Sequence, residues 1–483
     1  MRSVLMAPVA VSIVLGASLP RLDAQTLDRN QVPKPGPTPA LLVPSWTTTR
    51  LSNGALLVVT PKRDLPLVAF TINFVGGSYN FEPAGKLGTA QFTAQMLSEG
   101  TSTRTADQLS EAQQQLGTQI GASVSGETGS IGFTALRDKL EKALDLLADM
   151  LLHSTFPEPA LERIRGRTVV QLQQARDQPN AIAANVFVRT LYGTGHPYGR
   201  VTTETTVKAI TRDDIVAFHR EYFRPGRAVI TVTGDVDPSR VKATVEKALS
   251  GWSSGGTAPT WQYPAAPAAR ATTIYLVDKP KAAQSVFAIG LAGPARDTPD
   301  YYALSVMNHL LGGLFQSRLN HNIREVKGYS YGVGSSFAFG RGPGAFRAGG
   351  GVVTAKTDSA LIEFMKELRG VEGEIPFTED EITQGKESLI QSLPRRFSSV
   401  NGIGAAVAQV FVQDLPPTFY QDYSRHINAV AREDLVRVAR KYIDLGHLNI
   451  VIVGDSGVVA GPLRATGIAP VVVLDPEGNP ARP

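Results

Sequence analysis

The sequence contains no cysteine among its 483 residues. This absence excludes disulfide bonds, thiolate metal sites and cysteine nucleophiles, and it leaves the redox compartment undetermined. Net charge is also small, because 48 Lys and Arg residues face 43 Asp and Glu residues. The basic residues are dispersed rather than clustered, so nothing indicates nucleic-acid binding. A hydrophobic content of 42% is ordinary for a globular chain and allows roughly two to four domains.

Long apolar runs are missing everywhere except at the N-terminus. Met1-Arg2 is a minimal basic start, and a mainly apolar stretch from Val4 to Ala17 follows. The pattern predicts a secretory signal peptide at residues 1–24, cleaved after Ala24, although an uncleaved anchor is the alternative. We therefore expect a soluble mature protein that is periplasmic or secreted. Residues 25–45, rich in Pro, Gln and Thr, are predicted to form a flexible leader.

An internal repeat determines the predicted architecture. The segment Ile210–Asp235 is similar to Val430–Asp455, with a constant offset (430 − 210 = 220; 455 − 235 = 220). Each copy has the pattern of a helix followed by a buried strand that ends in Gly-Asp. We predict an α+β fold of two homologous domains, each a mixed, mainly antiparallel sheet with helices packed on one face. The expected boundaries are 46–250 for the first domain, 251–271 for a linker, 272–468 for the second domain and 469–483 for a tail.

Local patterns place several elements within this frame. Leu56–Val59 and Leu67–Ile72 have the pattern of strands, and residues 119–136 that of a hairpin. A helix is expected over 106–116, with Thr105 and Gln108 as a capping box and Gly117 as its end. An amphipathic helix is expected over 140–152. Residues 471–473 in the tail fit either a last strand or a loose end.

One short helix in the first domain has the spacing of a metal site without its side chains. Gln91 and Gln95 are one helical turn apart and share a face. Zinc peptidases of the inverted type place His-x-x-Glu-His on such a helix, with the two His as zinc ligands and the Glu as general base. In this sequence Gln occupies both His positions, and Ala94 occupies the position of the Glu.

The residues that flank this helix resemble those of the pitrilysin/insulinase family of zinc metallopeptidases. The family takes its third zinc ligand, a Glu, from a later helix that begins with a Glu-Arg pair. Here Glu162-Arg163 is such a pair, and Gln171 lies at the matching place (171 − 95 = 76). A neutral amide is a poor zinc ligand, and alanine cannot transfer a proton. The resemblance therefore implies no cofactor in this chain. The matching flanks are Gly77-Ser78, Glu82-Pro83, Gly85, Gly88, Met96-Leu97 and Gly100-Thr101.

The second domain resembles the family at a different motif. In the family an Arg precedes a Tyr by seven residues, and Arg324 and Tyr331 keep that spacing (331 − 324 = 7). The resemblance implies that these side chains face a zinc site across a chamber and bind the substrate carbonyl and the developing oxyanion. The alternative is a helix-end Arg paired with a Glu, and a core Tyr. Gly328–Gly332 also matches Gly-x-Ser-x-Gly, but the expected helix and strand come in the wrong order for a serine hydrolase.

The resemblance implies a function for the whole chain. Some members of the family work in pairs, in the layout of the mitochondrial processing peptidase subunits, and only one subunit carries zinc. This sequence is similar to the partner without zinc. We expect a subunit that is inactive alone and completes a peptide-degrading heterodimer with a zinc-bearing homologous subunit. The alternative is a stand-alone scaffold or peptide-binding protein with no role in hydrolysis; an active peptidase with unorthodox ligands is a third interpretation.

Overall fold

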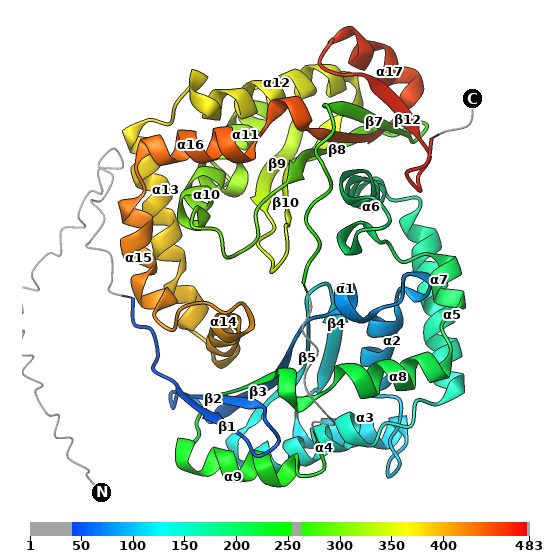
Figure 1. The fold of residues 1–483 in the computed structure, drawn as a ribbon, viewed down its shortest axis with the longest axis vertical. Coiled ribbons are helices and arrows are strands. Elements are labelled where there is room, and N and C mark those ends of the chain that lie inside the picture. The colour runs from blue at the N-terminus through cyan, green and yellow to red at the C-terminus, as the bar shows by residue number, and fades with distance from the viewer. Residues whose placement is uncertain (1–40, 254–261, 481–483) are drawn as a thin grey trace, which may run out of the picture. The chain divides into compact units, whose positions relative to one another are not determined.

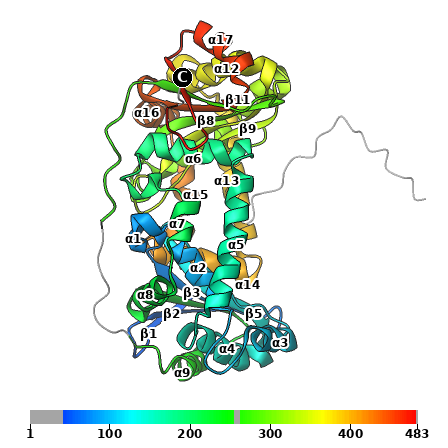
Figure 2. The ribbon, with the colours of Figure 1, turned by 90° about the vertical axis from the view of Figure 1, so that its right-hand side faces the viewer.

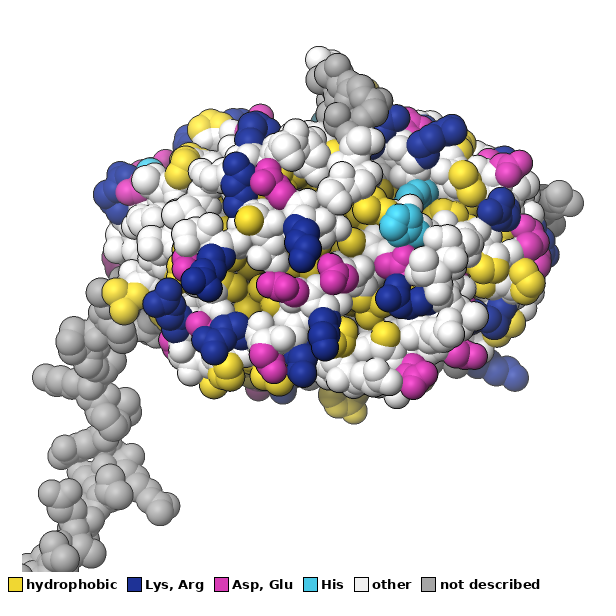
Figure 3. Space-filling model, turned by 90° about the horizontal axis from the view of Figure 1, so that it is seen from below, with side chains coloured by type: hydrophobic (Ala, Val, Ile, Leu, Met, Phe, Trp, Pro, Cys, Tyr) yellow, Lys and Arg dark blue, Asp and Glu magenta, His cyan; other side chains and the backbone are white. Residues whose placement is uncertain are grey.

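The computed structural model describes residues 41–253 and 262–480 (Figure 1). The predicted signal peptide lies outside the described residues, as does the leader up to residue 40. Residues from Leu41 onward form one unit by their contacts. In this described part no helix is both long enough and apolar enough to cross a membrane. On the face in Figure 3 basic and acidic side chains are intermixed, in agreement with the dispersed charge of the sequence.

The first half of the chain forms a six-stranded mixed sheet in the order β1-β2-β6-β3-β5-β4. Only the β2–β6 pair is parallel. Strand β6 is buried at every residue because it lies inside the sheet with both faces covered, whereas β5 alternates between buried and more exposed residues. The strands are β1 (Thr47–Arg50), β2 (Leu56–Pro61), β3 (Leu67–Val75), β4 (Gly121–Ser125), β5 (Thr128–Leu136) and β6 (Ala228–Gly234).

The second half has the order β12-β7-β11-β8-β10-β9 and repeats this topology in all strands but the edge strand β12. Strand β11 is parallel to β7 and antiparallel to β8, as β6 is to β2 and β3. The predicted α+β class with mixed, mainly antiparallel sheets is confirmed. The tail forms an edge strand parallel to β7. The strands are β7 (Thr273–Asp278), β8 (Gln284–Ala292), β9 (Ser330–Phe337), β10 (Ala345–Val353), β11 (Asn449–Gly454) and β12 (Val471–Leu474).

Local sequence signals define several helix ends. The Thr105 side chain accepts a hydrogen bond from the Gln108 N–H, and the Gln108 side-chain oxygen accepts one from the Thr105 N–H. Gly117 ends that helix at φ 62°. The helices of the first half are α1 (Ser78–Phe81), α2 (Thr89–Met96), α3 (Ala106–Leu116), α4 (Leu140–Leu152), α5 (Glu158–Ala175), α6 (Pro179–Tyr192), α7 (Glu204–Lys208), α8 (Arg212–Tyr222) and α9 (Pro238–Ala248). Those of the second half are α10 (Tyr301–Asn308), α11 (Arg318–Asn320), α12 (Thr357–Arg369), α13 (Glu379–Ser392), α14 (Val400–Val412), α15 (Phe419–Ala429), α16 (Arg432–Tyr442) and α17 (Ser456–Ala465).

Each half supplies one helix to the sheet of the other half. Helix α6 packs against β8 and β11, and its Val186 and Phe187 belong to the same buried cluster as Val451 of β11. Helix α14 packs against β3 and β6 of the first sheet. The two helices are equivalent in the repeat, since their starts are offset by 221 residues (400 − 179). Figure 2 shows α6 beside the second sheet and α14 near the first.

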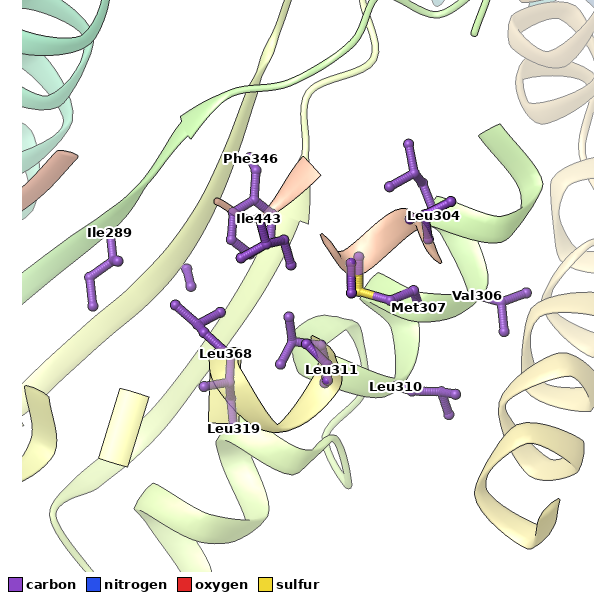
Figure 4. Close-up of a cluster of buried hydrophobic side chains, with 14 of the residues drawn as sticks. Ile289, Leu304, Val306, Met307, Leu310, Leu311, Leu319, Phe346, Leu368 and Ile443 are labelled. Atoms are coloured by element: carbon purple, nitrogen blue, oxygen red, sulfur yellow. The ribbon is translucent and has the colours of Figure 1, made fainter. Parts of the chain in front are cut away.

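The core of the second half surrounds α10, which takes the place that α2 has in the first half. Leu304, Met307 and Leu311 are fully buried on and just after this helix (Figure 4). The chain continues as a π-helical turn, His309–Gly313. At Gly312 a Cβ atom would collide with the backbone and side chain of Ser335 on β9, so the close approach requires glycine. Helix α10 and the turn after it therefore pack tightly into the core of the second half.

Candidate functional site

The start of α2 is fixed by a half-buried carboxylate. The side chain of Glu82 accepts hydrogen bonds from the N–H groups of Gly88, at 3.0 Å, and Ala90, at 2.6 Å. Gly88 caps the helix with φ 106°, a conformation that favours glycine. Burial raises the pKa of Glu82 to about 7, against the opposing effect of the two N–H donors. Glu82 and Gly88, two of the flanking residues that resemble the family, therefore position the start of α2.

Helix α2 buries its apolar side and presents outward the two positions that match the family's His ligands. Phe92 and Met96 are fully buried, and Ala94 is 4% exposed. Gln91 is exposed and Gln95 is half-buried. The backbone therefore displays positions 91 and 95 on one accessible face, as a metal site would require, and their side chains are amides.

Helix α5 runs beside α2 in a regular register. Arg163 makes an ion pair with Glu99, just beyond α2. One turn further, Arg167 Nη2 donates to Gln95 Oε1 at 2.7 Å. One turn back along the chain from Glu99 to Gln95 is thus matched by one turn forward from Arg163 to Arg167. The two helices are therefore antiparallel, with their turns facing one another.

One more turn in this register would set Gln91 of α2 opposite Gln171 of α5, and both residues are exposed. Three amides and one alanine thus stand at the positions where the family would have two imidazoles and two carboxylates, and the guanidinium of Arg167 lies beside Gln95. An amide is a poor ligand for zinc, and the charge of Arg167 opposes a dication. The residues present do not fit zinc, and the described residues include no group of three or more His, Cys, Asp or Glu side chains that could hold a metal.

Arg324 lies in a π-helical segment, His321–Val326, that ends before β9. Its guanidinium carbon is 4.2 Å from the centre of the Phe315 ring, and its Nη1 is 3.0 Å from a carboxylate oxygen of Glu325. Gly328 N–H donates to the Arg324 carbonyl with φ 65°, which ends the helical segment. The Arg–Glu pair of the alternative interpretation is therefore present, but the Arg324 guanidinium also stacks on the Phe315 ring.

Tyr331 is the second residue of the edge strand β9 and is 89% exposed. The alternative interpretation placed it in the core, and this exposure excludes that position. Among the described residues its hydroxyl has no hydrogen-bond partner. Gln91, Gln95 and Gln171 form one group on α2 and α5, whereas Arg324 and Tyr331 lie in the other half of the chain (Figure 1). In the part of the chain that the structure describes, no hydrogen bond or ion pair joins the two groups.

A polar junction between the halves was missed by the sequence analysis. Glu127, in the turn between β4 and β5, accepts hydrogen bonds from the backbone N–H of Arg341 at 2.7 Å and of Gly342 at 3.1 Å, and from the Tyr198 hydroxyl. Burial, and then the Glu127 carboxylate, raise the pKa of Tyr198. The partners are 71 and 214 residues away in sequence, so no local pattern could have paired them.

Comparison with known proteins determines the family. Residues 58–205 match the model described as "Insulinase (Peptidase family M16)", and residues 209–389 match "Peptidase M16 inactive domain". The chain belongs to peptidase family M16. An uncharacterized zinc protease of Bacillus subtilis (strain 168), YmxG, is 28% identical to this M16 chain over 352 residues, covering 72% of the chain and 84% of the relative.

Solved structures support the same assignment. A crystal structure described as a peptidase M16 inactive domain from Pseudomonas fluorescens has a TM-score of 0.78 and 25% identity, covering 85% of this M16 chain and 98% of that chain. The periplasmic protease PqqL from Escherichia coli has a TM-score of 0.70 at 16% identity, covering 88% of this chain and 51% of that one. At that identity PqqL shows the shared fold alone.

Proposed function

We propose that this M16 chain is the non-catalytic subunit of a periplasmic zinc metallopeptidase heterodimer that degrades peptides. The observation that carries the proposal is a preserved helix pair without metal chemistry: α2 and α5 keep their register, but they present Gln91, Gln95, Gln171 and Ala94. A scaffold of this kind remains able to dock against a homologue while lacking both zinc ligands and a general base.

The proposed contribution of this chain is made by Arg324 and Tyr331. Zinc, held by the partner, would supply the activated water. Arg324, stacked on Phe315, offers a fixed positive charge, and the exposed Tyr331 offers a neutral O–H donor. Two such donors at an interface would orient the substrate carbonyl and stabilise negative charge as it develops on the oxygen. Their roles as substrate-binding and oxyanion-stabilising residues are part of the proposal.

Co-purification from the native host tests the pairing. We expect a tagged chain to recover an M16 homologue with the complete His-x-x-Glu-His motif, about one zinc per heterodimer, and peptide hydrolysis that a chelator abolishes. The chain alone should bind no stoichiometric zinc. The periplasmic location is checked in the same host by fractionation.

The alternative is a stand-alone scaffold or peptide-binding protein. It predicts that the chain is recovered without a zinc-bearing M16 homologue and that mixing it with such homologues from the same host produces no activity. Either result would replace the heterodimer proposal.

A further inference from the structure

A cavity of about 910 Å³ lies in the second half of the chain, beside the junction with the first. Its walls come from residues 262–266, the loop 295–297, the β9–β10 connection at 341–343, and residues 413–414 after α14, with Val75 from the first half. The volume is within the range of about 300–1,000 Å³ that small-ligand sites occupy. The cavity is separate from both groups of residues discussed above.

A buried cation lines this cavity. Arg296 is only 7% exposed, and its Nε and Nη2 atoms have no hydrogen-bond partner among the described residues. Its guanidinium carbon lies 3.4 Å from the centre of the Tyr301 ring and 5.1 Å from that of Phe419. Stacking on aromatic rings offsets part of the desolvation cost, but it does not satisfy the N–H donors. An anion that accepts from these N–H groups would lower the cost of burying the guanidinium.

The other charged groups of the cavity do not supply that anion. Asp414 is 2.7 Å from Nη2 of Arg341, and Arg341 Nε also donates to the Val412 carbonyl at 2.8 Å, so these two side chains satisfy one another. Asp297 also lines the cavity, but it is exposed. In the described part of the chain no ion pair joins Arg296 to either carboxylate.

We propose that this cavity binds a carboxylate and that Arg296 receives it. A planar guanidinium can donate two parallel hydrogen bonds to the two oxygens of a carboxylate, and both bonds are then charge-assisted. It therefore matches a carboxylate better than a neutral carbonyl. The amide side chains of Gln262 and Gln413 line the same space and suit the polar atoms next to a carboxylate. The carboxylate belongs either to the C-terminus of a short peptide or to a free organic acid. This inference does not depend on the proposed heterodimer.

Calorimetric titration of the isolated mature chain at neutral pH tests the site. The probes are N-acetyl-tetraalanine with a free carboxylate, the same peptide as its C-terminal amide, and succinate. We expect the free acid to bind and the amide to bind at least ~10-fold more weakly, since the amide lacks the charge. Binding of succinate without the peptide acid would identify a free organic acid as the source. No binding of either acid, or equal binding of acid and amide, would overturn the proposal.

Variants assign the binding to one residue. Arg296→Gln should weaken binding of the acid by roughly 10-fold or more, whereas Arg296→Lys should retain part of it. Arg240→Gln is the matched control, because Arg240 lies on α9, does not line the cavity and has a side chain that is 87% exposed. Undiminished binding by a folded Arg296→Gln chain would overturn the assignment. If that variant fails to fold, the comparison of acid with amide in the unaltered chain still decides whether the site recognises a carboxylate.

Discussion

At the scale of single residues, the α2–α5 pair presents amides at the positions where the family has zinc ligands. Gln95 is held by Arg167, and Gln91 lies one turn along the same face. Helices α2 and α5 still pack side by side, but the positive charge next to Gln95 is the guanidinium of Arg167. Arg167 was not anticipated from the sequence, because it belongs to none of the ligand positions.

Replacement of Tyr331 or Arg324 should impair catalysis by the mixed complex and leave its folding intact. We expect Tyr331→Phe or Arg324→Ala to lower kcat about a hundredfold, the usual effect of losing one oxyanion donor of ~3 kcal/mol. Assembly and zinc content should be unchanged in both variants, and the thermal midpoint should be unchanged in Tyr331→Phe because Tyr331 is exposed. Turnover and thermal unfolding are measured on the same preparations. Wild-type turnover in both variants would show that the pair has no catalytic role.

Restoring the metal ligands should restore zinc binding, and removing Arg167 should strengthen it. A variant with Gln91→His, Ala94→Glu, Gln95→His and Gln171→Glu supplies the family's donor set on helices already in register. Adding Arg167→Gln removes a charge that repels a dication by ~1.7 kcal/mol at about 5 Å in water, so affinity should rise about tenfold. Zinc affinity is measured by competition with a chelating dye.

The matched control adds Arg163→Gln in place of Arg167→Gln, because Arg163 lies one turn away and is already paired with Glu99. Its effect on zinc affinity should be smaller. A well-folded variant that ignores zinc with and without Arg167 would show that the side-chain positions of α2 and α5 do not converge on one point.

At the scale of elements, close backbone approach explains part of the glycine-rich motif. Gly77 has an extended backbone (φ −156°) that any residue can adopt. A Cβ atom there would nevertheless lie 2.6 Å from the Thr128 N atom and closer still to the carbonyl oxygens of Ser125 and Gly126. The β4–β5 turn therefore rests directly on the chain that leads to α2, and it carries Glu127 to the second half.

Gly77→Ala should destabilise the protein by about 1–3 kcal/mol, because the collision is with backbone atoms that cannot rotate away. Gly166→Ala is the control: Gly166 is an exposed position within α5, and its Cβ would meet nothing within 4 Å. That substitution should stabilise by about 0.5–1 kcal/mol through helix propensity. Denaturant unfolding measures both variants, and equal stability of the two would contradict the packing argument.

At the scale of the whole molecule, the exchange of α6 and α14 ties the two homologous halves into one structure. Val186 of α6 is fully buried in a cluster built from strands of the second sheet. Val58 of the first sheet, equally buried, belongs to the core cluster of the second half. Each sheet thus depends on the other half of the chain to cover one of its faces.

Separated halves should therefore be unstable alone. A fragment of residues 41–261 would expose the face of its sheet that α14 covers, and a fragment of residues 262–483 would lack α6. We expect each fragment to bind a hydrophobic dye and to lose cooperative unfolding, and the mixed fragments to reassemble. Gel filtration and thermal unfolding check this. A first fragment that unfolds at the midpoint of the intact chain would instead support two independent domains.

The stability of the molecule should fall in acid, partly through Asp300. Burial alone would raise the pKa of this carboxyl, but hydrogen bonds from Lys441, Arg437 and Tyr442 lower it to about 2. A folded pKa below the unfolded value of 3.8 stabilises the protein above pH 3.8, and this stabilisation is lost as the pH falls through 2. The contribution is at most about 2 kcal/mol.

Unfolding free energies between pH 5 and pH 2 measure this effect, and Asp300→Asn should flatten the acid limb. Glu82→Gln is an informative contrast, because the pKa of Glu82 is raised to about 7. Its stabilising contribution is fully present below the ordinary carboxyl pKa of 4.5 and is lost as the pH rises through 7, so this variant should flatten the neutral limb instead. An acid limb unaltered by Asp300→Asn would assign the acid sensitivity to other carboxylates.

The sequence alone determined the features that depend on local pattern and fixed offset. The repeat at 220 residues, the Thr105 capping box and the short helix with Gln91 and Gln95 are all visible in it, because helix spacing and capping involve neighbours within a few residues. Family membership followed from the same patterns. The roles of Arg324 and Tyr331 stay predictions, although the exposure of Tyr331 was decided by the fold.

Only the tertiary structure decided which surfaces meet. Apolar periodicity marks the buried face of α6, but it does not say which sheet covers that face. The hydrogen bond between Arg167 and Gln95 joins residues 72 apart, and Glu127 accepts from an N–H group 214 residues away. The sequence does not distinguish Arg296 from the other arginines, and only the fold places it against Tyr301. Partners of this kind are fixed by packing between distant segments, since a polar group is satisfied by whatever the fold brings within hydrogen-bond distance.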